Sequence, residues 1–446
     1  MSAAFRRARG RPTGGGRIPT TCWWGGDSAG TVADVGLSPV QRGRAFGWTW
    51  RERVQHAFPL VRTVFLLWLA TRIFYLLVTY VSWDLRLSQM PPSLTTFVGL
   101  WARYDVAWYL QIASHGYANP LMANFFPLFP MLTGGLSWLL GNGAGPIYHH
   151  RPEHVRMLAG MLISNAGLLV GLLAVARLAH LERERDDDTD AGPRAALLML
   201  AYPFALVWTI PYAEGLFVAL AALTLLFARQ RNWYWAALTA ALCGLTRPVA
   251  AILVLPLAWE YGSHRGLWRW PPQLHLRDVG GGLAVIGAVP LAMSAYFGYL
   301  YLRFQSLAVL FSNLGAHWER VVQPYWRTFL QAGHRVLFDR GTSVLAFESA
   351  LIAAFAVLVV VSIRRIPLSY ALWVGGLIAM AAIAPTPSAT DLLYGTSRYL
   401  AGALPIYLIV ADWTRDRRWL GSLLIAGGFT LQGTLTIALF EDRSII

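Results

Sequence analysis

Residues 100–117 read Leu-Trp-Ala-Arg-Tyr-Asp-Val-Ala-Trp-Tyr-Leu-Gln-Ile-Ala-Ser-His-Gly-Tyr, and a short polar turn separates them from Asn-Phe-Phe-Pro-Leu-Phe-Pro at 124–130. Apolar side chains recur at intervals of three and four residues from Trp101 to Ile112, which is the pattern of an amphipathic helix. The stretch lies between two apolar segments, so we expect this helix to lie flat on a membrane with its aromatic side chains at head-group level. It would hold one carboxylate, that of Asp105, at the edge of the bilayer. A solvated helix face, or a partner for Arg103, is the plainer interpretation of such a carboxylate.

The composition is that of a multi-pass membrane protein. The chain has 446 residues, of which 56% are hydrophobic and 13% charged, and its mean hydropathy is +0.46, whereas soluble domains carry about 25% charged residues. All 37 basic residues are arginine, which suggests a GC-rich genome and a bacterial source, and the formal net charge is +14. The arginines lie mostly in the N-terminal segment and between apolar segments. This distribution encodes membrane orientation and does not indicate nucleic-acid binding.

Two parts of the chain differ in composition. Residues 1–56 are rich in Gly, Arg, Pro and Thr and lack apolar periodicity, so we expect a disordered, basic, cytoplasmic tail. Residues 57–446 form the membrane domain. The first apolar run, 57–81, is long enough to span a bilayer, and the arginines before it place its start in the cytoplasm. The loop at about 82–126, which carries Asp105, then faces outward.

Further spans are expected at about 127–141, 157–180, 194–211, 213–229, 234–258, 281–302, 344–363, 367–385, 399–411 and 419–440. The predicted fold is therefore all-α, a polytopic transmembrane helical bundle of about eleven spans. A second long loop at about 303–343 mixes aromatic and basic residues and suggests another segment resting on the membrane interface.

The expected topology contains a conflict. Simple alternation places 181–194 outside, whereas the arginines of that loop place it inside. Residues 234–258 could form two half-spans that turn at Arg247 and Pro248, which would change the orientation of the segments that follow. The acidic residues of the 181–194 loop could also weaken the arginine signal. Both alternatives stay open at this point.

Three charged residues interrupt or adjoin apolar runs. Glu214 lies in Pro-Tyr-Ala-Glu-Gly-Leu-Phe at 211–217, a turn that is either a solvated hairpin or a carboxylate site at the membrane surface. An arginine such as Arg247 costs about 2.5–3.5 kcal/mol in the middle of a span, so it normally has an anionic partner or a wet cavity. A lipid phosphate would serve, and a hairpin tip at the surface is the structural alternative. Arg398, followed by Tyr399, could bind a phosphate through its planar fork, or pair with Asp391.

Metal binding is not indicated by the sequence. Cys22 and Cys243 lie in different kinds of segment and form no metal site or disulfide framework. His149, His150 and His154 lie in a short loop without the helical spacing of a zinc protease. We therefore expect neither a metal nor another cofactor.

These motifs resemble those of one family. Arg-Tyr-Asp at 103–105 with the motifs that follow it through 130 resembles the first external loop of the PIG-V-like mannosyltransferases, membrane enzymes of the GT-C fold that take sugar from a polyprenyl-phosphate donor. Residues 211–217 are similar to the family element Pro-Tyr-x-Glu-Ser-Leu-Phe, with Gly215 in place of the serine. Arg398 and Tyr399 resemble an Arg-Tyr element at the start of a late span. The resemblance covers about 57–410, and Val106 stands where many relatives have glycine, which leaves the acceptor open.

The resemblance implies a function and a set of site residues. It implies transfer of mannose from polyprenyl-phosphate-mannose to a lipid or glycan acceptor on the extracytoplasmic side. Because the sequence indicates neither a nucleophilic Ser-His pair nor a metal, direct displacement with inversion is the simplest mechanism. Asp105 would be the catalytic base, with Glu214 as the second candidate. The substrate-binding residues would be Arg103, Tyr104, Trp108, Tyr109, Tyr117, Phe126, Pro127, Tyr212, Arg247, Arg398 and Tyr399.

A polytopic transporter or a flippase for lipid-linked sugars is the alternative function. Such a protein would be indicated by paired halves with broken helices in matching positions. The sequence shows no such halves. Its densest polar and aromatic cluster follows the first span alone, which favours an enzyme acting on lipid-linked substrates.

Overall fold

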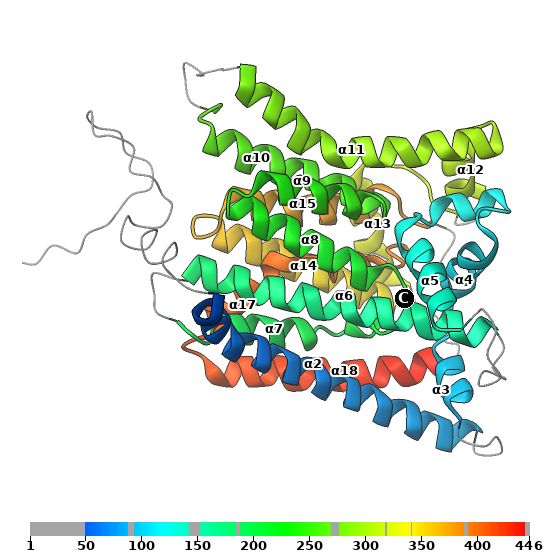
Figure 1. The fold of residues 1–446 in the computed structure, drawn as a ribbon. Helices are drawn as coiled ribbons and strands as arrows, with labels where there is room; N and C mark the ends of the chain where they lie inside the picture. The colour runs from blue at the N-terminus through cyan, green and yellow to red at the C-terminus, as the bar shows by residue number, and fades with distance from the viewer. Residues whose placement is uncertain are drawn as a thin grey trace, which may run out of the picture. The chain divides into compact units, whose positions relative to one another are not determined.

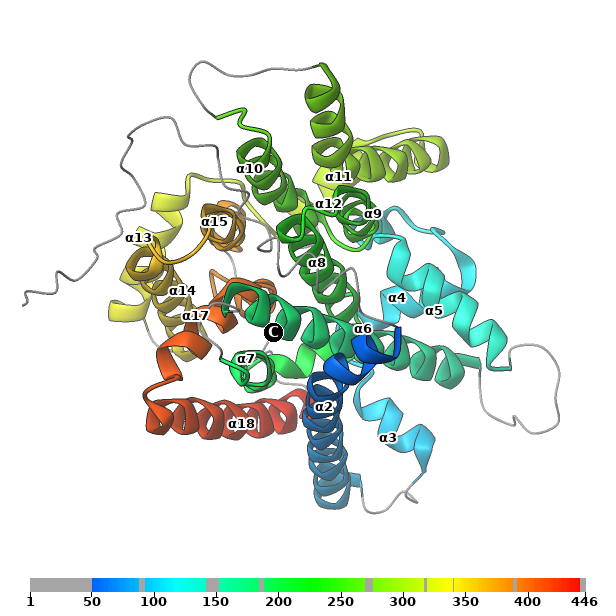
Figure 2. The ribbon, with the colours of Figure 1, turned by 60° about the vertical axis from the view of Figure 1, so that its left-hand side comes forward.

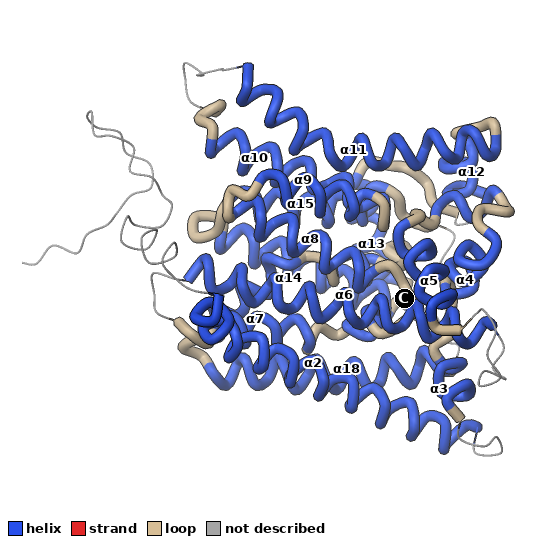
Figure 3. Tube along the Cα trace, in the orientation of Figure 1, coloured by secondary structure: helices blue, strands red, loops and turns tan. Residues whose placement is uncertain are grey.

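The computed structural model describes residues 50–87, 93–141, 152–183, 188–268, 276–316, 319–339, 341–387 and 391–441. Within these ranges the chain forms helices joined by turns and loops and contains no strand, which confirms the all-α prediction (Figures 1 and 3). Residue contacts divide the chain into Met1–His56 and Ala57–Ile446. The predicted tail lies outside the described residues as far as residue 49, so its disorder and cytoplasmic position stay predictions.

Five helices are long and apolar enough to cross a membrane. They are α2 (Trp50–Leu87), α6 (Pro152–Arg183), α11 (Leu276–Phe304), α14 (Ser343–Ser362) and α18 (Arg418–Phe440). Shorter apolar helices are α5 (Leu128–Leu139), α7 (Ala191–Leu200), α15 (Leu368–Ile383) and α17 (Leu404–Thr414). The chain is a helical membrane protein, and the expected number of about eleven spans stays a prediction.

The remaining elements are short. They are α3 (Leu94–Leu100), α4 (Val106–His115), α8 (Glu214–Arg229), α9 (Trp233–Gly244), α10 (Val254–His264), α12 (Ala308–Ala316), α13 (Tyr325–Phe338) and α16 (Thr396–Leu400), with 3₁₀ turns η1 (Pro120–Asn124), η3 (Ala205–Trp208) and η4 (Pro248–Leu253). In the second long loop, α13 exposes Tyr325, Trp326 and Leu330, as expected of an amphipathic helix.

The two ends of the bundle differ in the helices and charged residues that lie there. Helices α3, α4, α5 and α12 gather at one end, which we call the site end (Figures 1 and 2). At the other end, α6, α8 and α14 finish, and α18 begins (Figure 1). Arg183, Arg229, Arg365 and Arg418 lie at these helix ends, so we call it the arginine end.

The apolar run at 127–141, expected to be a span, forms a helix that is too short to be a candidate span. Helix α5 has 12 residues, about 18 Å, which is too short to cross a hydrocarbon layer of about 30 Å. It lies against α4 instead, so closely that a Cβ on Gly134 would come within 2.7 Å of the carbonyl oxygen of Ala113. Helix α6 consequently starts at the site end and reaches the arginine end at Arg183 (Figure 1). Arg183 therefore lies at the opposite end of the bundle from the start of α6, and the membrane orientation of the 181–194 segment stays a prediction.

The turn considered within 234–258 is present, and whether the two helices beside it are half-spans stays a prediction. Helix α9 ends at Gly244, the chain turns through Arg247 and Pro248, and η4 leads into α10. Arg247 has an extended backbone with φ −158° and ψ 149°, the conformation that a following proline favours. The turn places a charged side chain inside the bundle without breaking a long helix.

The expected helix from Trp101 to Ile112 is not continuous. Helix α3 ends at Leu100, and α4 begins only at Val106. Tyr104 between them has φ +48°, a left-handed conformation that interrupts an α-helix. Trp101 and Ile112 are buried in the protein, whereas the sequence predicted aromatic and apolar side chains at head-group level. Their burial reflects packing against other helices, so apolar periodicity here marks the protein core.

Candidate functional site

Four charged side chains from distant segments meet near the site end. Nη1 of Arg398 lies 2.9 Å from Oδ2 of Asp105, and Nε of Arg398 lies 3.2 Å from Oε1 of Glu214. The same Oε1 atom of Glu214 lies 2.6 Å from Nη1 of Arg247. Two carboxylates and two guanidinium groups thus form one continuous series of ion pairs, which we call the site network.

The break between α3 and α4 positions Asp105. The N–H of Asp105 donates to the hydroxyl oxygen of Tyr212 at 3.2 Å, and that hydroxyl donates to the carbonyl of Arg103 at 3.0 Å. Burial and the neighbouring Asp105 hold the pKa of Tyr212 well above its ordinary value, so the phenol remains a neutral donor. Tyr212 therefore fixes the loop that carries Asp105 to the segment that carries Glu214.

Glu214 is the most enclosed carboxylate of the site network. It begins α8, and its side chain is 4% exposed, whereas that of Asp105 is 25% exposed. Gly215 beside it allows α8 to touch α6, because a Cβ at this position would lie 2.1 Å from the carbonyl oxygen of Ser164. This contact explains why glycine stands where the resembling family has serine.

The arginines of the site network are stacked on tyrosine rings. The guanidinium of Arg247 lies 5.1 Å from the ring centroid of Tyr399, and that of Arg398 lies 5.6 Å from the ring centroid of Tyr212. Burial lowers the pKa of Arg398, but Glu214 and Asp105 raise it more, so that it lies well above its ordinary value. Arg398 stays charged throughout the accessible pH range.

Arg320 lies near the site network, although the sequence analysis did not predict it as a site residue. It lies in the segment before α13 and donates to the carbonyls of Ala384 at 2.9 Å and Tyr394 at 3.1 Å. Burial opposes ionisation of Tyr399, but the charges of Arg320, Arg247 and Arg398 outweigh it and lower the pKa of the Tyr399 hydroxyl. The long loop at 303–343 was recognised as aromatic and basic, but no local pattern distinguishes Arg320 from the other arginines in it.

Arg103, Tyr104 and two predicted aromatic residues lie around the site network. Nη2 of Arg103 donates to the carbonyl of Phe440 at 3.0 Å, at the end of α18, where a cation complements the helix dipole. Tyr104, in the break before Asp105, is 36% exposed. Tyr109 lies with its ring centroid 6.1 Å from that of Tyr212, and Trp108 stacks on Phe125 at 6.0 Å.

Three other predicted substrate-binding residues hold the 117–128 segment against neighbouring helices. The hydroxyl of Tyr117 donates to the carbonyl of Phe125 at 2.5 Å, and Phe126 is buried against Tyr296 of α11. Pro127 leads into α5, where the N–H of Leu128 donates to the carbonyl of Leu245 at 2.9 Å. These contacts brace the 117–128 segment against α9 and α11.

The alternative pairing of Arg398 with Asp391 is wrong, because Arg398 binds Asp105 and Glu214. The carboxyl of Asp391 accepts from the N–H of Leu393 at 3.1 Å, and it lies close enough to the carboxyl of Glu348 of α14 for their charges to interact. Glu348 in turn accepts from the N–H of Ser397 at 3.1 Å. This acid pair supports the segment that carries Arg398.

A pH-dependent stability follows from the acid pair. Burial raises the pKa of Asp391 above its ordinary value of 3.8, so the folded state binds this proton more tightly than the unfolded state does. The resulting stabilisation is complete in acid and is lost as the pH rises through the folded pKa. We expect the decrease in melting temperature with rising pH to be smaller in Asp391→Asn than in the wild type, as measured by thermal unfolding. The exposed Asp84 supplies the control variant Asp84→Asn, and equal slopes in all three proteins would contradict the assignment.

The predicted absence of a metal stays a prediction. His149 and His150 lie outside the described residues, and His154 lies in α6. Within the described ranges, no three His, Cys, Asp or Glu side chains are grouped as metal ligands.

No protein-family model and no curated protein matches the sequence significantly. Among solved structures, the chain is similar to ArnT from Cupriavidus metallidurans bound to undecaprenyl phosphate, with 16% identity and a TM-score of 0.44 over 80% of this chain and 62% of that one. It is also similar to the Archaeoglobus fulgidus oligosaccharyltransferase in complex with Zn and sulfate, with 15% identity and a TM-score of 0.38 over 83% and 53% of the two chains. The chain thus covers less than two thirds of either structure, and similarity at this level carries no argument about activity.

Proposed function

We propose that the chain is an integral membrane glycosyltransferase of the PIG-V-like kind, with a GT-C-like fold. It moves mannose from a polyprenyl-phosphate donor to a hydroxyl of a lipid or glycan acceptor, with inversion at the anomeric carbon. One observation carries the proposal. Segments 103–105, 211–217 and 398–399, each picked out in the sequence by resemblance to one family, meet through direct ion pairs.

The two carboxylates have different environments, and these assign different roles. Glu214 receives two arginines on one oxygen and is nearly closed to solvent, so its charge is neutralised and it positions Arg247 and Arg398. Asp105 receives one nitrogen of Arg398 and is more exposed. A base must reach the acceptor's proton. Asp105 is therefore the base of the proposed reaction.

The reaction is a direct displacement. The acceptor oxygen attacks the anomeric carbon, its proton passes to the carboxylate of Asp105, and the bond from the anomeric carbon to the phosphate oxygen breaks with its electron pair leaving on the phosphate. Arg247 and Arg398 stabilise the charge that develops on that phosphate. Arg320 adds a third cation near Tyr399, so that three guanidinium groups face two carboxylates, an excess of positive charge suited to an anionic donor.

The arginine distribution supports an orientation. Arginines concentrate at the opposite end of the bundle from the site network, and arginine-rich ends of membrane proteins normally face the cytoplasm. The proposal therefore places the site network on the extracytoplasmic side of the cell membrane. Its partners are the lipid-linked donor, the acceptor and the surrounding membrane lipids, and nucleic acid is not among them.

Donor identity tests the proposal. Purified protein is incubated with mannose-labelled polyprenyl phosphate or with a labelled mannose nucleotide, in the presence of a membrane lipid extract as acceptor. We expect labelled product from the polyprenyl-linked donor alone, because no Gly-rich nucleotide loop is present in the sequence. Turnover from the nucleotide donor alone would overturn the proposal.

A further inference from the structure

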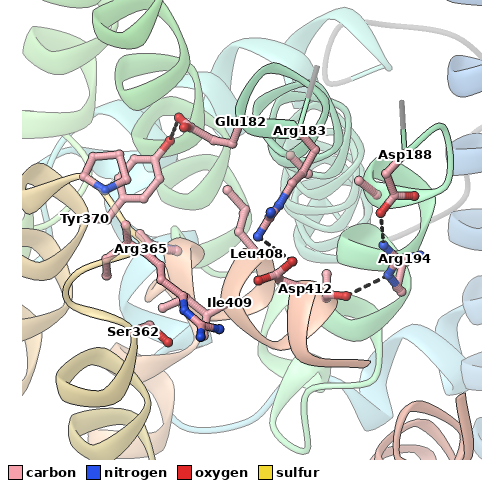
Figure 4. A pocket seen from close by; sticks show the side chains of 16 residues that line it. Glu182, Arg183, Asp188, Arg194, Ser362, Arg365, Tyr370, Leu408, Ile409 and Asp412 are labelled. Carbon is pink, nitrogen blue, oxygen red and sulfur yellow. Dashed lines mark hydrogen bonds and ion pairs between the residues drawn. The ribbon is translucent and has the colours of Figure 1, made fainter. Parts of the chain in front are cut away.

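A cavity of about 120 Å³ opens at the arginine end of the bundle, away from the site network. Helices α6, α7 and α17 line it together with the turn between α14 and α15 (Figure 4). Its polar lining includes Arg183, Arg194, Arg365, Asp188, Asp412 and Ser362. The apolar side chains of Ile366 and Leu408 complete part of the wall.

The acidic side chains of the cavity are already paired. Arg183 pairs with Asp412, and Arg194 pairs with Asp188 (Figure 4). Nε of Arg194 also donates to the carbonyl of Ala411 at 2.7 Å. These contacts fix one side of the cavity as a rigid, ion-paired wall.

The other side offers two donor side chains for which no acceptor lies among the described residues. Ser362 is 2% exposed, and its hydroxyl has no hydrogen-bond partner among the described residues. No described carboxylate lies within ion-pair distance of Arg365. Figure 4 shows Arg365 on the Ser362 side of the cavity, apart from the pair formed by Arg183 and Asp412. Buried polar groups are normally satisfied, so the open hydroxyl of the buried Ser362, in a cavity also lined by the exposed Arg365, points to a ligand that accepts hydrogen bonds.

We propose that this cavity binds a phosphate group through Arg365 and Ser362. A guanidinium fork and a hydroxyl together suit the several oxygens of a tetrahedral phosphate. The position of the cavity indicates where such a ligand would come from. Ser362 is the last residue of α14, one of the five helices long enough to cross the membrane. Lipid head groups lie where such helices end. The phosphate belongs either to a phospholipid or to inorganic phosphate, and the site is independent of the proposed sugar transfer.

The test uses the full chain and a matched pair of arginine variants. Arg365 lines the cavity, whereas the adjacent Arg364, which is also exposed, does not. Phosphatidylglycerol binding is counted by native mass spectrometry in detergent, and inorganic phosphate binding is measured by calorimetry on the same preparations. We expect at least about tenfold weaker binding for Arg365→Gln, because a charge-assisted contact is lost. Arg364→Gln is expected to bind as the wild type does.

The two probes separate the sources of the phosphate. Saturable phosphatidylglycerol binding that inorganic phosphate does not displace assigns a lipid head group, and the reverse assigns free phosphate. Ser362→Ala keeps the guanidinium and is expected to weaken binding of the same probe by a smaller factor. Equal losses in Arg365→Gln and Arg364→Gln would indicate surface charge alone and overturn the site. Unchanged binding of both probes by Arg365→Gln would also overturn it.

Discussion

Asp105→Asn is expected to lower the rate of sugar transfer by about 10²- to 10⁴-fold, the range that a positioned general base contributes. The amide keeps the shape of the carboxylate and can still accept from Arg398, but it cannot take up the acceptor's proton. The N–H of Asp105, which binds Tyr212, is unaffected by the change. We therefore expect the variant to fold and to bind donor normally. Single-turnover transfer and donor binding, measured on the same preparation, test both parts.

Two further variants make the first result specific. Asp84→Asn removes an exposed carboxylate near the end of α2 and is expected to leave transfer unchanged. Glu214→Gln tests the other candidate base. If Glu214→Gln abolishes transfer while Asp105→Asn transfers at the normal rate, the roles of the two carboxylates are reversed. Full activity in both variants would remove the chemical basis of the proposed glycosyltransferase.

Arg398→Lys is expected to lower turnover by about 10²- to 10³-fold, the loss that follows removal of one donor to a developing negative charge. Arg398 reaches Asp105 and Glu214 through different nitrogen atoms. Lysine keeps the charge but has a single ammonium group and loses the planar fork. Both carboxylates would lose a shared partner, so donor affinity is expected to fall together with the rate. Steady-state kinetics with varied donor concentration measures both.

Two comparisons complete the arginine test. Arg247→Lys keeps a cation beside Glu214 and is expected to have the same kind of effect, since Arg247 is the second proposed phosphate ligand. Arg303→Lys is the control, because Nε of Arg303 donates to the carbonyl of Tyr117 at 3.0 Å, a contact that an ammonium group can also make. Unchanged donor binding and rate in both Arg398→Lys and Arg247→Lys would place the phosphate elsewhere.

Charged residues inside apolar runs were the most informative part of the sequence. Burying a charge in a membrane span is costly, so Arg247 indicated an anionic partner or a wet cavity, whereas Glu214 indicated a carboxylate at the membrane surface or a solvated hairpin. The structure shows that Arg247 pairs with Glu214, and that Glu214 also pairs with Arg398. Sequence spacing could not predict these pairings, because they join segments that become neighbours only when the helices pack.

Apolar periodicity identified helices but not their depth or continuity. The 127–141 run is as apolar as a span, yet α5 lies against α4 because Gly134 allows the two backbones to touch. The break at Tyr104 depends on a left-handed backbone that tyrosine rarely adopts and that no local signal announces. Arg320 reaches the site end through contacts with Ala384 and Tyr394, which a sequence cannot reveal.

The central claim is that the site network forms a new glycosidic bond, and one measurement separates this from transport. The purified protein is placed in liposomes with mannose-labelled polyprenyl phosphate and an acceptor lipid, and the label is followed both chemically and across the bilayer. The account predicts that label appears on the acceptor, that unlabelled polyprenyl phosphate accumulates in equal amount, and that Asp105→Asn stops both. Recovery of the intact labelled donor on the opposite side of the bilayer, with no label on the acceptor, would contradict the account and identify a flippase instead.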